Sequence, residues 1–127
     1  QHYFIKLSSR DTDAELCLIE YTSKPCFHLK RQHNKLMTEV FYMLEGEMEL
    51  IFDDETILLN AGDTITVQPN VWHEALCRKV SKMLTIFKND QFDLFLEELS
   101  KMNEDDFAIK KRMDEVSAKY DIYEEVL

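Results

Sequence analysis

Glycine is nearly absent from this sequence. Gly46 and Gly62 are the only two among 127 residues, whereas glycine makes up about 7% of an ordinary domain. Because glycine reaches positive φ without the Cβ clash of other residues, it is favoured at tight corners between strands. Both glycines stand between runs that favour β-strand, so the sequence predicts two tight corners at these positions.

Cysteines and long apolar runs are also scarce. The three cysteines, Cys17, Cys26 and Cys77, are an odd number, lie far apart and form no C-x-x-C pair, so neither a disulfide framework nor a zinc site is indicated. No run approaches the roughly 18 uninterrupted apolar residues of a membrane span, and no basic segment leads into a short apolar one. We therefore expect a cytoplasmic protein with reduced thiols and no membrane partner.

Basic residues are outnumbered. The chain has 15 Lys and Arg against 25 Asp and Glu, which gives a formal charge of −10. This charge repels a phosphate backbone, and no basic patch with interleaved aromatic residues offsets it, so nucleic acid is not expected as a partner. Hydrophobic residues make up 45% of the chain, which is typical of a single globular domain.

Short runs that favour β-strand fill the chain up to Phe87. Turn-forming residues such as those at 60–63 separate the runs, and short connections between strands predict antiparallel pairing in a barrel or sandwich. The runs read HYFIKL, AELCLIEYT, CFHLK, EVFYML, EMELIF, TILL, TITVQ, EALC and SKMLTIF.

The apolar spacing then changes to a helical period. One predicted helix carries an apolar stripe of Phe92, Phe95, Leu96, Leu99 and Met102. A second begins after the capping residue Asn103 and carries a stripe of Ile109, Met113, Val116 and Tyr120. The sequence therefore predicts a β-barrel over residues 1–88 and, in the same domain, a helical extension over residues 89–127 that packs on the barrel.

The segments around the two glycines resemble the two sequence motifs of the cupin superfamily. The first motif reads H-x-H, three or four residues, E, six residues, G, and Glu39 with Gly46 fits its second half. The second reads G, five residues, P-x-G-x-x-H, three residues, N, and Gly62 with His73 fits it. The tail resembles the helical extension of cupins similar to quercetin dioxygenase. The resemblance implies an all-β fold, a cupin-type antiparallel β-barrel (jelly roll), with a C-terminal pair of α-helices.

The resemblance also implies a metal site, which this chain keeps only in part. Cupins hold a divalent metal such as iron, manganese, nickel or zinc with three imidazoles and one carboxylate. Here Glu39 and His73 match two ligands, while Gln32 and Asn34 occupy the two H-x-H positions. Amide oxygens are weaker ligands for these metals than imidazole. A gap one residue shorter supplies His33 as a third ligand, so the strand register decides between a metal site and none.

Strand alternation from Glu39 predicts a largely apolar interior with a few polar groups, which is typical of a small-molecule pocket. Cys77 stands where the cupin motif has Asn, and we interpret it as a small buried hydrophobe rather than a nucleophile. The same parity points Trp72 outward, where it is a candidate contact in a homodimer, as cupins often pair. The predicted pocket residues are Gln32, Asn34, Glu39, Phe41, Met43, His73 and Cys77.

Three functions fit these residues. The first is a cupin that binds a small molecule with a degenerate metal site, as a sensor or accessory module, and the lost imidazoles favour it. The second is a metal-dependent enzyme, a dioxygenase or a sugar isomerase. The third is a metal-free sugar epimerase or isomerase with His73 as general base, oriented by Glu39. The sequence assigns no catalytic residue beyond these alternatives, because one fold hosts many activities.

Overall fold

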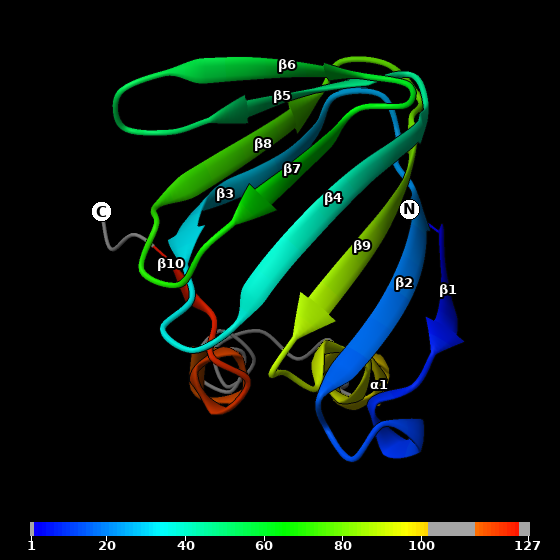
Figure 1. Cartoon of the computed structure of the whole chain (residues 1–127), viewed down its shortest axis with the longest axis vertical. Coiled ribbons are helices and arrows are strands. Elements are labelled where there is room, and N and C mark those ends of the chain that lie inside the picture. The colour runs from blue at the N-terminus through cyan, green and yellow to red at the C-terminus, as the bar shows by residue number, and fades with distance from the viewer. Residues whose placement is uncertain (1, 102–113, 125–127) are drawn as a thin grey trace.

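Two antiparallel sheets of five strands each face one another and form a jelly roll (Figure 1). The computed structural model describes residues 2–101 and 114–124. The first sheet contains, in spatial order, β1 (His2–Leu7), β2 (Leu16–Thr22), β9 (Lys82–Lys88), β4 (Thr38–Glu45) and β7 (Thr64–Val67). The second contains β10 (Tyr123–Glu124), β3 (Phe27–His33), β8 (His73–Cys77), β5 (Glu47–Ile51) and β6 (Thr56–Asn60). The predicted jelly roll is confirmed, although the described strands do not join the two sheets into a closed barrel.

The core lies between the two sheets. All the predicted strand runs are present as β1 to β9, and alternate residues of the central strands are buried, as the alternation predicted. Phe52 and Ile65 are partly buried against this core. The main buried cluster consists of Phe41, Met43, Met48, Leu50, Leu59, Val67, Ala75, Cys77 and Met83.

Both glycines lie at tight corners, as predicted. Gly46, between β4 and β5, has φ +80°, and Gly62, between β6 and β7, has φ +92°. The two corners differ in their surroundings. The backbone of Ser81 lies against Gly46, whereas nothing lies within 4 Å of the position that a Cβ on Gly62 would occupy.

A β-bulge in β3 sets which residues of this strand point inward. Leu29 pairs with Ala75 on β8, but the next inward pair is Gln32 with His73, so β3 contains one residue more than β8 over this stretch. A bulge of this kind reverses the alternation of the strand beyond it. Gln32 is therefore buried, with 7% of its surface exposed.

The first predicted helix is confirmed as α1 (Phe92–Ser100), which packs against β2 and against the short 3₁₀ helix η1 (Ser9–Asp11). Asp93 in its first turn accepts hydrogen bonds from the Ser8 hydroxyl at 2.9 Å and the Ser9 backbone N–H at 3.0 Å. Of the second predicted helix, residues 114–119 are helical, and the predicted cap Asn103 with the first part of the stripe lies outside the described residues.

The segment that follows residues 114–119 fastens the loop between β3 and β4. The Asp121 carboxylate accepts hydrogen bonds from three consecutive backbone N–H groups, those of Lys35 at 2.9 Å, Leu36 at 2.7 Å and Met37 at 2.9 Å. The Asn34 side chain donates to the Asp121 carbonyl at 2.8 Å. This end of the jelly roll is therefore held by residues far away in the sequence.

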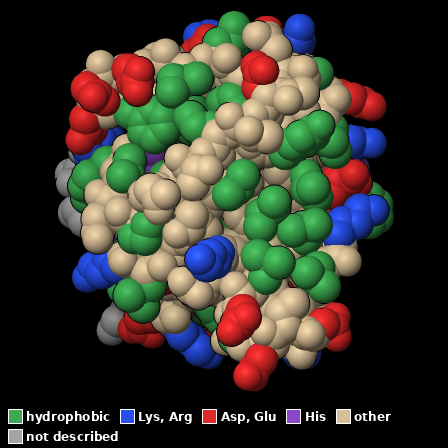
Figure 2. Space-filling model, in the orientation of Figure 1, with side chains coloured by type: hydrophobic (Ala, Val, Ile, Leu, Met, Phe, Trp, Pro, Cys, Tyr) green, Lys and Arg blue, Asp and Glu red, His purple; other side chains and the backbone are tan. Residues whose placement is uncertain are grey.

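The outer face of the first sheet is partly apolar. Figure 2 shows hydrophobic side chains gathered over the region where β4, β9 and β2 lie in Figure 1. Tyr42 and Leu44 on β4 are exposed there, at 39% and 36% of their surface. Within residues 2–101 and 114–124, no helix is long and apolar enough to cross a membrane. All three cysteines are free thiols.

Candidate functional site

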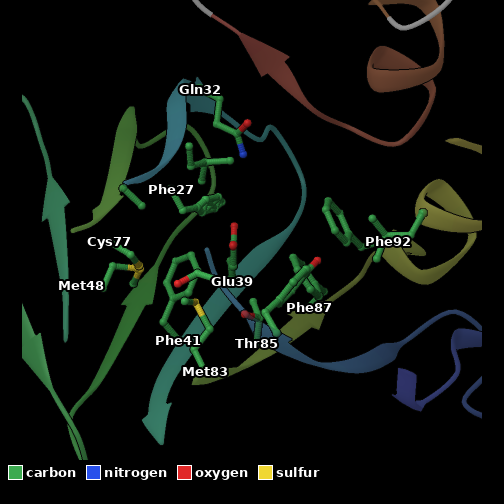
Figure 3. Close-up of a pocket in the computed structure, with 15 residues that line it drawn as sticks. Phe27, Gln32, Glu39, Phe41, Met48, Cys77, Met83, Thr85, Phe87 and Phe92 are labelled. Atoms are coloured by element: carbon green, nitrogen blue, oxygen red, sulfur yellow. The ribbon is translucent and has the colours of Figure 1, made fainter. Parts of the chain in front are cut away.

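An apolar cavity of about 220 Å³ lies between the two sheets. Its walls come from β2, β3, β4, β5, β8, β9 and α1 (Figure 3). No Lys or Arg is among the lining residues, and Glu39 is the one carboxylic acid among them. The lining consists of Tyr21, Ser23, Phe27, Leu29, Gln32, Glu39, Phe41, Met48, Ala75, Cys77, Met83, Thr85, Phe87, Phe92 and Leu96.

Glu39 is a buried acid that forms no ion pair with a Lys or Arg among the described residues. Its side chain projects from β4 into the space between the sheets, and 5% of the residue surface is exposed. Burial, together with a smaller contribution from the neighbouring carboxylate of Asp90, raises the pKa of Glu39 from 4.5 to about 8. Its Oε2 has no hydrogen-bond partner among the described residues. Near neutral pH the carboxyl group of Glu39 is therefore mainly protonated.

His73 lies beside Glu39 and is uncharged as well. Its Nδ1 donates to the Val71 carbonyl at 2.9 Å, so the proton of the neutral ring is on Nδ1 and Nε2 carries a lone pair. Nε2 lies 3.8 Å from Glu39 Oε2, beyond hydrogen-bond distance, and has no hydrogen-bond partner within residues 2–101 and 114–124. Burial lowers the pKa of His73; the bond to Val71 opposes the shift and His33 adds to it. The structure thus brings together the predicted acid and imidazole as a neutral pair.

Other titratable groups surround this pair. Asp90 follows β9, and burial raises its pKa from 3.8 to about 7. Tyr21 on β2 has a pKa well above its usual 10.0 because it is buried, and Glu39 adds to this shift. Asp90 and Tyr21, which interact electrostatically with Glu39, therefore also resist ionisation, and no positive charge from the cavity lining compensates a charge on Glu39.

The residues at the first metal motif do not complete a metal site. Gln32 reaches the cavity and presents an amide, while the Asn34 side chain is bonded to the Asp121 carbonyl instead. His33 does not line the cavity. The centroid of its ring lies 4.2 Å from that of the Trp72 ring and 5.3 Å from that of the Tyr123 ring. The bulge in β3 is the reason, because it points Gln32 inward and His33 to the other side of the sheet.

The donor set therefore does not fit the metal that the cupin motif implies. Within the described part of the chain, no three His, Cys, Asp or Glu side chains are arranged to hold a metal ion. Where a cupin metal site has three imidazoles and a carboxylate, this chain has the carboxyl group of Glu39, the imidazole of His73 and the amide of Gln32. The alternative set of His33, Glu39 and His73 is not brought together.

The predicted pocket residues divide into two groups. Gln32, Glu39, Phe41 and Cys77 line the cavity. Three others do not line it: Asn34, which is bonded to Asp121; Met43, which is fully buried in the core; and His73, which has no exposed surface.

Cys77 behaves as a buried thiol. Burial raises its pKa, although hydrogen bonds with Ser23 and Ser81 oppose the shift. A thiol with a raised pKa is a poor nucleophile, because the reactive form is the thiolate. This agrees with the interpretation of Cys77 as a small buried hydrophobe.

Four of the 15 lining residues were among the predicted pocket residues, so most of the cavity wall was not predicted from the sequence. The wall from β2, β9 and α1 includes Tyr21, Thr85, Phe87 and Phe92. Strand alternation would have placed Tyr21, Thr85 and Phe87 on inner faces, and the helical stripe already contained Phe92. What the sequence did not reveal is that α1 packs against β2 and the first sheet, where the Phe92 ring stacks on the Phe87 ring at 4.3 Å.

Trp72 was predicted to point outward as a dimer contact. In the structure, its ring has contacts within the chain, with the His33 ring and with the Arg31 guanidinium, whose central carbon lies 4.4 Å from the ring centroid. These contacts leave Trp72 half-buried.

Comparisons with known proteins agree with this architecture. The Cupin domain family, Cupin_2, matches residues 27–87. The quercetin 2,3-dioxygenase of Bacillus subtilis (strain 168) is 27% identical over 100 residues, which are 78% of this chain. The chain spans about 30% of the length of that curated relative.

Solved structures show the same fold at low sequence identity. A cupin superfamily protein from Desulfitobacterium hafniense DCB-2 superimposes with a TM-score of 0.61 and 19% identity, over 70% of this chain and 77% of that one. KdgF from Halomonas sp. gives a TM-score of 0.62 and 16% identity, over 72% of this chain and 82% of that one. These likenesses concern the fold.

Proposed function

Because this chain belongs to the cupin superfamily, we propose that it uses the cupin cup to bind a small, mainly apolar organic molecule, with a degenerate metal site. The cavity between the sheets carries this proposal, since it is walled by aromatic and aliphatic side chains with a few polar groups. An apolar cavity of about 150 Å³ accepts benzene, so 220 Å³ is sufficient for a ring with a short substituent.

The proposal expects little bound metal. Protein purified without chelator and without an affinity tag should contain iron, manganese, nickel or zinc at well below one equivalent per chain, because Glu39 and His73 lack two imidazole partners. Metal analysis by mass spectrometry measures this directly. Near-stoichiometric metal would favour the alternative, a metal-dependent cupin enzyme such as a dioxygenase or a sugar isomerase, and would contradict the metal-poor cup.

Filling the cavity is expected to abolish binding of an apolar probe. Ala75→Leu adds three carbon atoms at a buried position of the lining, so α-methylstyrene should bind at least tenfold more weakly than to the wild type. Chemical-shift titration of the backbone amides measures the affinity. Ala61→Leu is the matched control, because it makes the same change at an exposed turn and should leave binding unaltered. Equal binding by both variants would contradict the proposal.

The metal-free isomerase is less well supported. A general base must reach the substrate, and His73 has no exposed surface and does not line the cavity. Glu39 is the group that a ligand would meet. The homodimer expected from the sequence stays a prediction, and the exposed apolar residues on β4 give it a surface that does not depend on Trp72.

A further inference from the structure

We propose that Gln32 selects the molecule bound in this cavity, and that this molecule is a small, uncharged lactam or primary amide. The inference rests on the proposed function, because it names the ligand class of the same cavity. It starts from a side-chain amide that lies in a largely apolar space without a hydrogen-bond partner among the described residues (Figure 3).

The Gln32 amide is buried and unpaired. Gln32 lines the cavity, and 7% of the residue surface is exposed. Figure 3 shows its amide pointing into the cavity. Within residues 2–101 and 114–124, no group forms a hydrogen bond with this amide. A polar group that is buried without a hydrogen bond destabilises a fold, so a ligand that pairs with the amide would offset this cost.

Strand pairing holds Gln32 in place on both sides. Gln32 pairs with His73 on β8 and with Glu124 on β10. The bulge that begins after Leu29 turns the Gln32 side chain inward. The amide is therefore presented to the cavity from a strand inside a sheet and not from a loop, which favours a defined binding geometry.

A primary amide offers one donor and one acceptor side by side. The NH₂ group donates and the carbonyl oxygen accepts, so a ligand edge with the same two groups in reverse order forms two hydrogen bonds at once. A lactam or a primary amide has this edge, whereas an open-chain secondary amide is trans and does not. A ketone engages the donor alone and leaves the carbonyl of Gln32 unpaired.

Charge in the cavity does not alter this selection. The Gln32 amide carries no charge at any pH, so its pairing does not require a particular protonation state of Glu39. No Lys or Arg lines the cavity, and a carboxylate ligand would therefore lack a positive partner. Phe27 and Leu29, on the same strand as Gln32, supply an apolar wall for the ring of the ligand.

Three uncharged six-membered rings of nearly the same shape test this assignment. δ-Valerolactam has the donor and the acceptor, cyclohexanone has the acceptor alone, and methylenecyclohexane has neither. Chemical-shift titration of the backbone amides gives the affinity of each probe for the wild type and for Gln32→Met, which is similar in length and has no amide. The ratio of the two affinities for one probe cancels the cost of removing that probe from water.

The three ratios should differ in order. One neutral hydrogen bond corresponds to about fivefold in affinity. We expect Gln32→Met to weaken δ-valerolactam by at least about tenfold, cyclohexanone by about fivefold and methylenecyclohexane by less than about twofold. Gln68→Met is the matched control, because it makes the same change at an exposed position and should leave all three affinities unaltered.

A second measurement needs no variant. In the wild-type protein, the side-chain NH₂ protons of Gln32 should shift downfield when δ-valerolactam is added, because they donate to its carbonyl oxygen. Methylenecyclohexane should cause no such shift. Retained binding of methylenecyclohexane by Gln32→Met shows in turn that this variant is folded.

Each other outcome overturns either this inference or the proposed function, and the two cases differ. If methylenecyclohexane binds and δ-valerolactam does not, the lactam assignment is wrong and the binding cup stands. The same holds if Gln32→Met weakens δ-valerolactam no more than cyclohexanone, or if the Gln32 NH₂ protons do not shift. If none of the three probes binds to the wild type, the proposed binding function itself fails.

Discussion

Gly46→Ala is expected to lower the melting temperature by about 15 °C, from a loss of about 4 kcal/mol in unfolding free energy. A Cβ there would lie 2.4 Å from Ser81 Oγ and 2.9 Å from Ser81 Cα, at a φ of +80°. Ser81 cannot move away readily, because its backbone N–H donates to the Ser23 hydroxyl at 3.1 Å and its carbonyl accepts from the Ser23 N–H at 2.8 Å. Thermal unfolding followed by circular dichroism measures the loss.

Gly62→Ala supplies the matched control. The backbone is again left-handed, with φ +92°, but the added Cβ meets nothing within 4 Å. The expected loss is the backbone strain alone, roughly 1–2 kcal/mol. If both variants lose the same stability, the close approach of Ser81 to Gly46 is not what requires glycine there.

The two corners show what the sequence reveals about this fold. In a chain with so few glycines, each one marked a place where the backbone needs positive φ, and the runs around them had the alternation of half-buried strands. Both signals are local, and both predicted the observed corners and strands. The different surroundings of Gly46 and Gly62 were not visible in the sequence, because Ser81 is distant in the chain.

Local sequence signals did not predict the bulge in β3. Whether Gln32 or His33 points into the cup depends on one extra residue between Leu29 and Gln32, and neither Gly nor Pro marks the place. The register is fixed by pairing with β8 and by the aromatic contacts of His33 with Trp72, which are interactions between distant segments. Alternation within one strand therefore left two ligand sets open, and the tertiary structure excluded one of them.

The walls of the cavity were partly predictable for the same reason. The cupin motif placed Glu39 inside, and alternation along β4 then predicted that Phe41 also points inward; both line the cavity. The wall formed by α1 did not follow, since a helical stripe predicts burial but not the surface that it covers. The bonds of Asp121 to the loop at 35–37 were likewise beyond the sequence, because they join residues 84 or more positions apart.

The second large effect is expected for Glu39→Gln, as a stability gain that depends on pH. The folded protein holds a proton on Glu39 up to about pH 8, whereas the unfolded chain releases it near the usual 4.5. Between these values the folded state binds more protons, so wild-type stability falls as pH rises. At about 1.4 kcal/mol per pH unit, the variant should gain about 4 kcal/mol relative to wild type by pH 8 and nothing below pH 4.5. Urea unfolding at several pH values measures this difference.

Glu45→Gln on the same strand is the control for this experiment, because Glu45 is exposed and its replacement should change stability by less than about 0.5 kcal/mol at any of these pH values. A gain for Glu39→Gln that does not grow with pH would mean that Glu39 is not held protonated by burial. A gain that grows with pH would instead mean that the fold keeps a buried acid at a cost to its own stability, which is expected where a side chain serves binding rather than packing.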